Sequence, residues 1–457
     1  MSEYETHWRK PKETKVMWLA LLFAMMSQTM LSYSMCEDEP PEYQGISVAI
    51  SELYRLRTAQ SLMLGDITKC APHTLEALLF NTMSEWARKE ENEARVWMMV
   101  GLLVRIGLQM GYHRDPSHFP SISVFQGEMR RRVWGFIHRS DSLTSFLIGL
   151  PSMIRAIEQD TAEPRNLYDW ELTADMIELP PSRPFSEITQ SSYLIVKGRM
   201  LGPLGNIVDF LSSLGKYNYD TALQLDRDLE MAHQEIPEYF KMTLGEDDVV
   251  DTIPSLTNRR LQLEFLYHQG MCVLHRKFVA QGRSDPRYVP SRSRCIESAV
   301  ALLAQQYYLY VQTVLKGQVA ARHWYRVSYV GQEYILAAMI LVLELRQRKL
   351  EAFYGDHEAR AQEEAKIFRA LEKASLIWED VENSPEAAKV HKVLSSMMGH
   401  IRAPPARDGV SFLQPEMPAV VPEYDTQQLD MSSAANLEFV GDMDIDWYVN
   451  MSMCSSN

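Results

Sequence analysis

The segment from Val96 to Met110 constrains the fold most, because it is apolar on almost every side of the helix that it would form. Only two glycines, one arginine and one glutamine interrupt it. A helix that is apolar all round is buried inside a protein rather than lying on its surface. Gly101 and Gly107 carry no side chain, so another backbone can come close to the helix there. We expect the helix to end at Gly111 in a left-handed cap, and Pro116 keeps it from resuming.

A second helix is predicted directly afterwards. Ser123 and Gln126 have the spacing of a capping box, which marks a helix start. Glu128 and Arg132 lie four residues apart in the order that favours a side-chain ion pair. Apolar residues recur behind them at close to the helical period until Pro151, and the residue before a proline avoids helical backbone angles. The two helices are therefore expected to form a buried pair inside a larger helical domain.

Helical periodicity continues on both sides of this pair, and no alternating run of any length predicts a strand. The predicted fold class is all-α. Further helices are expected over Val16–Met30, Ile46–Met63, Pro72–Glu90, Phe185–Leu214, Asp220–Phe240, Leu256–Gln281, Ser291–Leu315, Ala321–Arg348, His357–Asp380 and Pro385–Met398. Between Ala156 and Arg183 the period is lost and prolines are frequent. We predict a long ordered loop there, its backbone held by Asp160, Asn166 and Asp169.

The composition divides the chain into three parts. Residues 1–15 are polar and are predicted to be a disordered N-terminus. Residues 16–400 carry the helical periodicity and are predicted to form one large helical domain. Residues 401–457 are rich in proline and acids, and we predict that they form a disordered tail.

The tail has the composition and the residue pattern of an activation segment. It holds nine acids against two arginines, which is about half of the net charge of the chain. Near its end, Leu437, Phe439, Ile445, Trp447 and Tyr448 alternate with acids. Acidic and hydrophobic alternation of this kind is typical of disordered activation domains. An ordinary solvated tail is the alternative, and both interpretations stay open.

The charge of the whole chain argues against direct binding to DNA. The sequence has 46 basic and 60 acidic residues, a net charge of -14. Affinity for nucleic acid rests largely on Lys and Arg that neutralise phosphates. We therefore predict that this chain alone does not bind DNA specifically.

The cysteine pattern is typical of a reducing compartment without disulfides. The five cysteines are scattered and never form a C-x-x-C pair. They are Cys36, Cys70, Cys272, Cys295 and Cys454. No region of the sequence therefore supplies a cluster of cysteines for zinc.

An eleven-residue apolar run from Val16 to Met26 follows three lysines. No small-residue cleavage site follows it, as a signal peptide would require. The run is too short to span a membrane, and the polar residues Ser27, Gln28 and Thr29 interrupt its continuation. We predict a buried core helix and no membrane association.

One enzyme pattern is present. Asp247, Asp248 and Asp251 fit the DDxxD pattern with which helical prenyl-diphosphate cyclases hold magnesium. Gly245 and Pro254 indicate a loop, and no second metal motif accompanies the pattern, so a solvated acidic loop is the preferred interpretation. A magnesium-dependent cyclase is kept as the alternative function. Turnover of a prenyl diphosphate that is lost when Asp247 and Asp248 become asparagine would favour it.

Two further patterns fit metal sites only in part. His268, Cys272 and His275 share one helical face and offer atoms that zinc accepts, but a fourth ligand is not evident. Three aspartates from Asp442 to Asp446 begin like a calcium loop, but Trp447 occupies the position that requires glycine. We predict no catalytic, cofactor or metal site in this chain.

The stretch from Ala94 to Asp169 resembles the fungus-specific transcription factor domain, the regulatory middle region of fungal activators with a binuclear zinc cluster. The positions that carry the resemblance, which we expect to be structural, are Trp97, Gly101, Gly111, His113, Arg114, Asp115, Glu128, Arg130, Arg131, Arg132, Trp134, Asp141, Gly149, Pro151, Asp160, Pro164, Asn166 and Asp169. Two departures are visible, because Gly135 stands where a second tryptophan is usual and Leu150 where arginine is usual. The flanking sequence resembles the family only in its helical periodicity.

The resemblance implies a regulatory domain over residues 16–400 and a function in the regulation of transcription in a fungal nucleus, without catalysis. DNA contact is then expected from a zinc-cluster segment that this sequence lacks, or from a partner chain, and zinc only with that segment. The tail is expected to contact the transcription machinery, and a homodimer or a DNA-binding partner is expected. Regulators of this family often serve metabolic gene clusters, including those of secondary metabolism. An interaction protein without regulatory output is a further alternative.

The charged motif residues are expected to hold the domain together. Residues 113–115 spell the kinase triplet His-Arg-Asp, but the asparagine that should follow is Pro120 and no Gly-rich phosphate loop precedes it. A helix-ending turn is therefore preferred. The arginines at 130–132 cannot form one DNA-binding face, because consecutive helical residues point about 100° apart.

These arginines are expected to pair with carboxylates nearby, one of them with Asp115 or Asp141. Asp141 has apolar neighbours along its helix, so we predict that its carboxylate is buried. A buried carboxylate needs a cation and donors. The nearest candidates in the sequence are Arg105 and Arg114.

Overall fold

The computed structural model describes residues 2–35, 39–88, 93–213, 218–242, 254–311, 332–350, 357–380 and 385–402. Within these ranges every regular element is a helix and none is a strand, which confirms the all-α prediction. The α-helices are α1 (Ser2–Arg9), α2 (Val16–Met35), α3 (Ser47–Gly65), α4 (Thr74–Trp86), α5 (Glu93–Gln109), α6 (Val124–Ile148), α7 (Ser192–Ser212), α8 (Tyr219–Gln234), α9 (Pro254–His275), α10 (Val289–Tyr310), α12 (Gln332–Leu350), α13 (His357–Asp380) and α14 (Pro385–Arg402). The aspartates of the DDxxD pattern and the tail from residue 403 lie outside the described residues.

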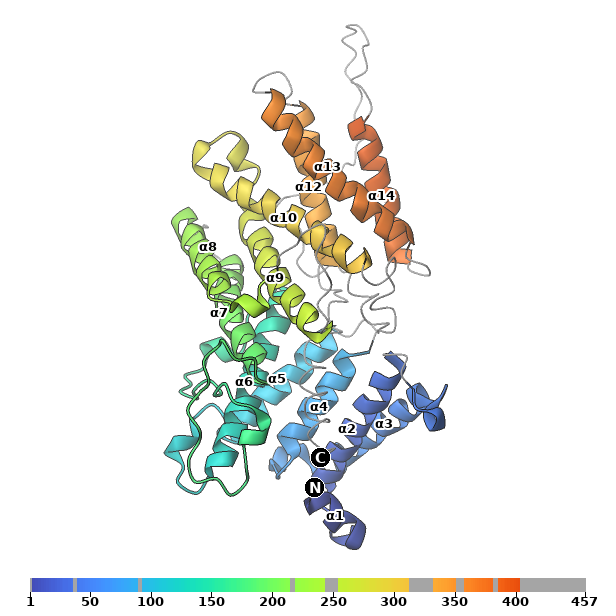
Figure 1. Ribbon diagram of the computed structural model, residues 1–457, viewed down its shortest axis with the longest axis vertical. Helices are drawn as coiled ribbons and strands as arrows, with labels where there is room; N and C mark the ends of the chain where they lie inside the picture. Colours follow the sequence, from blue (N-terminus) through green and yellow to red (C-terminus); the bar gives the residue numbers. More distant parts are fainter. Residues whose placement is uncertain are drawn as a thin grey trace.

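Two hydrophobic cores lie one after the other along the molecule, and α9 contributes to both. The first core, which includes Ile137, is built from α2 to α9. The second, which includes Trp378, is built mainly from α10 and α12 to α14. Leu266 of α9 belongs to the first core and its neighbour Phe265 to the second. Figure 1 shows this order along the long axis, with α9 and α10 between the two ends.

The first residues differ from the predicted disordered N-terminus. Residues Ser2–Arg9 form α1, and Pro11–Glu13 form a 3-10 turn. His7 Nδ1 lies 2.7 Å from Thr14 Oγ1, and its ring lies 5.3 Å from the ring of Trp18 on α2. This polar segment is therefore held by contacts with α2 that its own composition does not reveal.

Helix α2 runs well beyond the apolar run that predicted it. Ser27 does not interrupt the helix, because it is buried and hydrogen-bonded to α3. Its Oγ donates to the carbonyl oxygen of Ser51 (2.9 Å), and Ser51 Oγ donates to the carbonyl oxygen of Ser27 (2.7 Å). By length and composition, Val16–Ser34 is apolar enough to cross a membrane, contrary to the prediction that it is too short, and one third of it is buried. Its buried face packs against α3 and α4.

The α5–α6 pair has the predicted ends. The capping box at Ser123 is present, and Gly111 and Gly149 have φ angles of 72° and 69° in the left-handed region. A Cβ added at Gly107 would lie 3.0 Å from the ring of Trp134. The close approach at this glycine is therefore to a side chain of α6, and not to a backbone as we expected.

Candidate functional site

The family-motif residues gather on the α5–α6 pair and on the loop that follows it. They lie as follows: Trp97 and Gly101 on α5; Gly111, His113, Arg114 and Asp115 in the connecting turn; Glu128, Arg130, Arg131, Arg132, Trp134 and Asp141 on α6; Gly149, Pro151, Asp160, Pro164, Asn166 and Asp169 behind it. Between α6 and α7 the chain has only two 3-10 turns, η5 (Ile154–Ala156) and η6 (Asp169–Glu171), as the predicted long loop requires. The motif thus lies where a long loop meets the first core.

Asp115 joins the turn, α6 and the loop. Its carboxylate accepts two hydrogen bonds from Arg131, of 2.9 and 2.7 Å, and one of 3.0 Å from the backbone N–H of Ala162. It also accepts from the N–H of Ser117 and so caps the 3-10 turn Pro116–His118. These donors, Arg131 foremost, hold the pKa of Asp115 well below its ordinary value. The pairing of one arginine with Asp115 is confirmed, and the kinase-like triplet acts as a structural turn.

Arg132 connects α6 to the far end of the loop. Its Nη1 lies 2.6 Å from Asp169 Oδ1, and its Nε lies 3.7 Å from Glu128 Oε1, the pair predicted from the spacing. Glu128 is fully buried and also accepts a 3.0 Å hydrogen bond from the backbone N–H of Arg165. Burial raises the pKa of Glu128 even though arginines surround it. Asp169 therefore binds a side chain rather than the loop backbone that we predicted.

Asn166 binds the backbone of the loop, as predicted, whereas Asp160 binds the backbone of the turn before α6. Asp160 Oδ1 accepts a 2.9 Å hydrogen bond from the N–H of Asp115. Asn166 is fully buried, and its Nδ2 donates to the carbonyl oxygen of Arg183 (3.1 Å). Its Oδ1 accepts from Ser192 Oγ (2.7 Å) at the start of α7. Together they fix the loop at both of its ends.

Asp141 is buried, as predicted, but its partners are not cations. The side chain is 1% exposed, and its Oδ2 accepts hydrogen bonds from Ser152 Oγ (2.5 Å) and from the N–H of Ile154 (3.0 Å). Arg105 donates to a backbone oxygen of its own helix, and Arg114 pairs with another aspartate. The predicted ion pair is wrong, because the turn after α6 brings backbone donors to the carboxylate. Burial raises the pKa of Asp141, and these hydrogen bonds oppose that effect.

Three further contacts complete the motif. Trp134 Nε1 donates to Gln159 Oε1 at 2.7 Å, and Arg130 donates to a backbone oxygen at the end of α5 at 2.6 Å. A Cβ added at Gly135 would lie 3.6 Å from the ring of Pro164. Gly135 thus packs close to the loop at Pro164, and the structure gives no reason why the usual tryptophan is absent here.

The side chains of His268, Cys272 and His275 have other partners within the protein. His275 Nδ1 lies 2.9 Å from Ser291 Oγ and its Nε2 2.9 Å from Asp226 Oδ1, so both ring nitrogens are engaged. Burial lowers the pKa of His268 to about 4. Among the residues that the structure describes, no three His, Cys, Asp or Glu side chains come together as a metal site.

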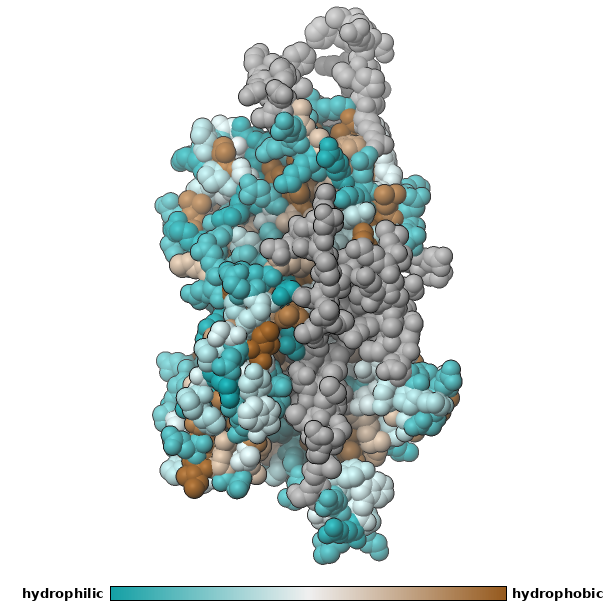
Figure 2. Space-filling model, in the orientation of Figure 1, coloured by the Kyte–Doolittle hydropathy of each residue, from teal (hydrophilic) through white to brown (hydrophobic). Residues whose placement is uncertain are grey.

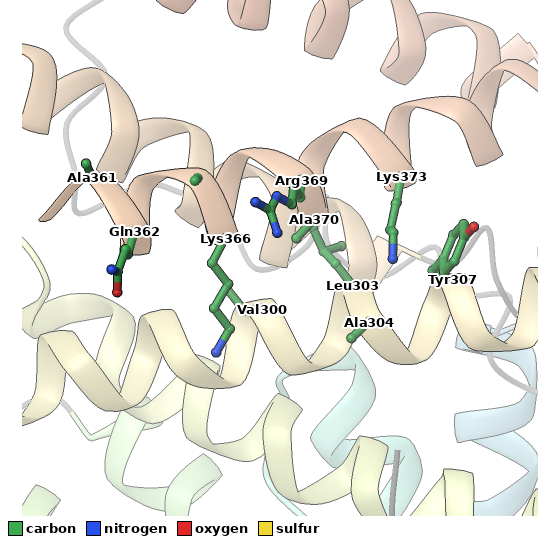
Figure 3. A pocket seen from close by; sticks show the side chains of 11 residues that line it. Val300, Leu303, Ala304, Tyr307, Ala361, Gln362, Lys366, Arg369, Ala370 and Lys373 are labelled. Carbon is green, nitrogen blue, oxygen red and sulfur yellow. The ribbon is translucent and has the colours of Figure 1, made fainter. Parts of the chain in front are cut away.

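A shallow groove of about 740 Å³ lies between α10 and α13. Its floor includes Leu303 and Tyr307, and Figure 3 shows Lys366 and Lys373 reaching from α13 toward α10, with Arg369 between them. This arrangement suits an anionic group attached to an apolar body. All three cations are exposed to solvent, so salt screens their charge and the groove is not an enclosed pocket.

The sequence did not reveal the partners that the loop and the start of α7 supply. Ser152, Gln159, Arg165 and Ser192 each bind a motif residue. Only Ser152 gives a sequence signal, because it follows the proline that ends α6. Gln159 and Arg165 lie in a stretch without periodicity, where spacing does not indicate a partner. Ser192 lies on a predicted helix, but its spacing from Asn166 in the sequence does not indicate a contact.

Most ionisable groups of the motif are engaged with one another and with backbone groups, which defines a structural centre of an all-helical domain. Residues 4–239 match the family model described as the fungal specific transcription factor domain, and the chain belongs to this family. The resemblance inferred from Ala94 to Asp169 is thereby confirmed.

Known relatives are named as transcription factors. The chain is 34% identical to the Zn(2)-C6 fungal-type transcription factor pigI of Monascus ruber over 87% of this chain and 49% of the relative. It is 33% identical to the Zn(2)-C6 fungal-type transcription factor mpsB of Macrophomina phaseolina over 86% of this chain and 53% of the relative. It is 32% identical to the equisetin cluster transcription factor eqxF of Fusarium heterosporum over 89% of this chain and 59% of the relative. The chain thus spans about half the length of the curated relatives that it matches, and no solved structure matches it.

Proposed function

We propose that this chain regulates transcription in a fungal nucleus. It controls a metabolic gene cluster whose enzymes make secondary metabolites. The observation that carries the proposal is the family match over residues 4–239, supported by relatives named as cluster transcription factors. DNA contact comes from a zinc-cluster segment or a partner chain, and zinc belongs to that segment. The cyclase alternative has no support from these relatives.

The structural centre supports this role by fixing a long loop in place. Asp115, in the turn before α6, binds the loop at Ala162. Glu128 and Arg132 of α6 bind it at Arg165 and Asp169. A loop held by so many partners keeps one shape, and loops placed on a rigid scaffold are where proteins commonly bind their partners. We infer that the domain offers this loop face and the acidic tail to the transcription machinery.

The chain is expected to activate a reporter gene when it is fused to a heterologous DNA-binding domain in a fungal host. The acidic tail supplies the activating surface, because acids keep its apolar residues solvated and available to a partner. Replacing Phe439, Ile445, Trp447 and Tyr448 with alanine should reduce reporter expression several-fold. Expression is measured at equal protein level.

The matched control changes polar residues of the same tail. Gln427→Ala with Gln428→Ala should leave reporter expression unchanged. If the wild-type fusion leaves the reporter at the level of the DNA-binding domain alone, the proposed function of the chain is contradicted. If both sets of variants behave alike, the assignment of the tail is wrong.

The purified chain alone is expected to give no sequence-specific complex in a mobility-shift assay at physiological salt. The net charge of -14 repels the phosphate backbone, and the scattered cysteines form no zinc cluster. The probe is promoter DNA of the genes that the chain controls. The heterologous fusion with its own operator serves as the positive control. A specific complex at nanomolar concentration of the unfused chain would refute this prediction.

A further inference from the structure

A basic segment, residues 9–15, joins α1 to α2. Its sequence is RKPKETK, so it holds four cations and one acid in a chain whose net charge is -14. All four cations are exposed, and they are Arg9, Lys10, Lys12 and Lys15. The arginines at 130–132, by contrast, are engaged within the structural centre. The basic segment is therefore a concentration of positive charge that the domain leaves on its surface.

The fold makes little use of these charges. Two of the cations form exposed ion pairs with acids close by in the sequence, Arg9 with Glu5 at 3.9 Å and Lys10 with Glu13 at 3.1 Å. Exposed pairs contribute little to stability, so a partner can replace them at small cost. Neither Lys12 nor Lys15 has a carboxylate within ion-pair distance in the part of the chain that the structure describes. The segment is thus open to a partner that presents carboxylates.

The backbone of the basic segment can become extended without disturbing the core. Pro11 lacks a backbone N–H and separates α1 from α2, and only a 3-10 turn forms behind it. Thr14 already has extended backbone angles. Every residue from 3 to 15 lies outside the core, and the first buried side chain is that of Met17. Figure 1 shows α1 projecting from one end of the molecule, and Figure 2 shows hydrophilic residues there. Local opening of this end therefore exposes no buried apolar surface.

The spacing of the cations indicates how a partner binds them. In an extended chain, alternate side chains point to the same side, so Lys10 and Lys12 lie together and Arg9 points away from them. Two neighbouring ammonium groups match a groove lined with carboxylates. The lysine stems can pack on aromatic side chains of such a groove. Short segments rich in Lys and Arg are typical of nuclear-import signals and of nucleic-acid contacts.

Nucleic acid is the less suitable of these two partners. Affinity for it grows with the number of phosphates that cations neutralise, and the segment offers only four cations. The acids Glu3, Glu5 and Glu13 lie beside them in the sequence, and the whole chain is acidic. A short groove contacts only the segment itself, and salt screens charges that lie beyond about 8 Å. The observations therefore favour a receptor with an acidic groove.

We propose that residues 9–15 are a nuclear-import signal, which an import receptor with an acidic groove binds through Lys10 and Lys12. This inference rests on the proposed function in the nucleus, and it names the kind of partner that brings the chain there.

The first test follows the full chain, joined to a fluorescent protein, in a fungal host. The wild type should concentrate in the nucleus. Lys10→Ala with Lys12→Ala should lower the ratio of nuclear to cytoplasmic fluorescence several-fold, and an unrelated import signal added to this variant should restore the ratio. Lys366→Ala with Lys373→Ala is the matched control, since it removes two exposed lysines from α13. The control should leave the ratio unchanged.

Purified proteins test the contact itself. The full chain should bind purified importin-α of the host. The double alanine variant at positions 10 and 12 should bind about a hundredfold more weakly, because it loses two charged hydrogen-bond donors. Raising the salt concentration should weaken the wild-type complex, since salt screens exposed charges. Equal melting temperatures of all variants show that they fold.

Three outcomes would each overturn the proposal. They are a wild type that stays in the cytoplasm, equal binding of importin-α by wild type and the double alanine variant, and a variant that loses binding to nonspecific duplex DNA while its nuclear fraction is unchanged. The proposed function is tested apart from the import signal, by a fusion to a DNA-binding domain that carries its own import signal. The double alanine variant of that fusion should activate the reporter as the wild type does. A fusion without reporter activity contradicts the proposed function and not the import signal.

Discussion

Asp141→Ala is expected to lower the free energy of unfolding by about 2–4 kcal/mol, since each buried polar group left without a partner costs about 1–3 kcal/mol. The carboxylate accepts hydrogen bonds from Ser152 Oγ and from the N–H of Ile154. Alanine removes both acceptors and leaves a cavity, while the two donors stay buried. Ile154 is itself fully buried in the first core, so the turn cannot move to solvent without exposing it.

Asp141→Asn separates the role of the shape from the role of the charge. Asparagine retains an acceptor oxygen at nearly the same place, and it carries no charge to desolvate. Burial raises the pKa of Asp141 from its ordinary value of 3.8. A carboxyl with a raised pKa contributes its stability below the ordinary pKa and loses it as the pH rises through the folded pKa. The stability of Asp141→Asn relative to wild type should therefore increase between acidic and neutral pH.

Both predictions are checked by denaturant unfolding of the three proteins at several pH values. Asp175→Ala is the matched control, because Asp175 is exposed, and such a change should alter stability by no more than about 0.5 kcal/mol. An Asp141→Ala protein as stable as the control would show that the hydrogen bonds to the turn contribute nothing. If the free energy of unfolding of wild type increases relative to that of Asp141→Asn as the pH rises, the pKa of Asp141 is lowered instead.

Asp141 also illustrates what the sequence can reveal about this fold. Its burial follows from the apolar residues around it on α6, and the ends of α6 follow from the capping box at Ser123 and from Gly149. Its partners do not follow, because a backbone N–H in a loop has no signature in the sequence. The pair of Glu128 and Arg132 was predictable because both residues lie on one helix, where the spacing fixes the distance.

Helix α3 shows what the periodicity of a sequence does not reveal. Its periodicity predicts a helix correctly, and the same pattern would place Leu53 and Leu56 in the core. The structure buries the hydroxyl side instead, because Ser27 and Ser51 bond across the close contact of α2 with α3. Periodicity therefore predicts the helix but not the side of it that the fold buries.

Glu344→Ala is expected to lower the free energy of unfolding of the second core by about 3–5 kcal/mol, the usual cost of removing one partner of a buried ion pair. Glu344 of α12 is fully buried among three arginines. Arg292 of α10 donates to it, Arg348 Nε lies 2.6 Å from its Oε1, and Arg283 Nη2 lies 3.2 Å from its Oε2. Without the carboxylate, three guanidinium groups remain close together with little water to screen them.

The pH dependence of this cluster has the opposite sign to that of Asp141. Burial alone would raise the pKa of Glu344, but the hydrogen bonds from Arg292 and Arg348 outweigh it and hold the pKa below its ordinary value of 4.5. A carboxyl with a lowered pKa stabilises the fold above its ordinary pKa, and that contribution is lost as the pH falls through the folded pKa. The advantage of wild type over Glu344→Gln should therefore shrink on acidification below about pH 4.5.

Hydrogen exchange locates the effect, because α10, α12 and α13 share the second core while α5 and α6 lie in the first. Glu344→Ala should speed exchange in the former helices more than in the latter. Glu297→Ala on α10 is the control, since Glu297 is exposed. Equal acceleration in both cores would mean that α9 couples them into one unfolding unit. An unchanged exchange rate in α12 would mean that the three arginines are tolerated without their carboxylate, and that the buried cluster does not hold the second core together.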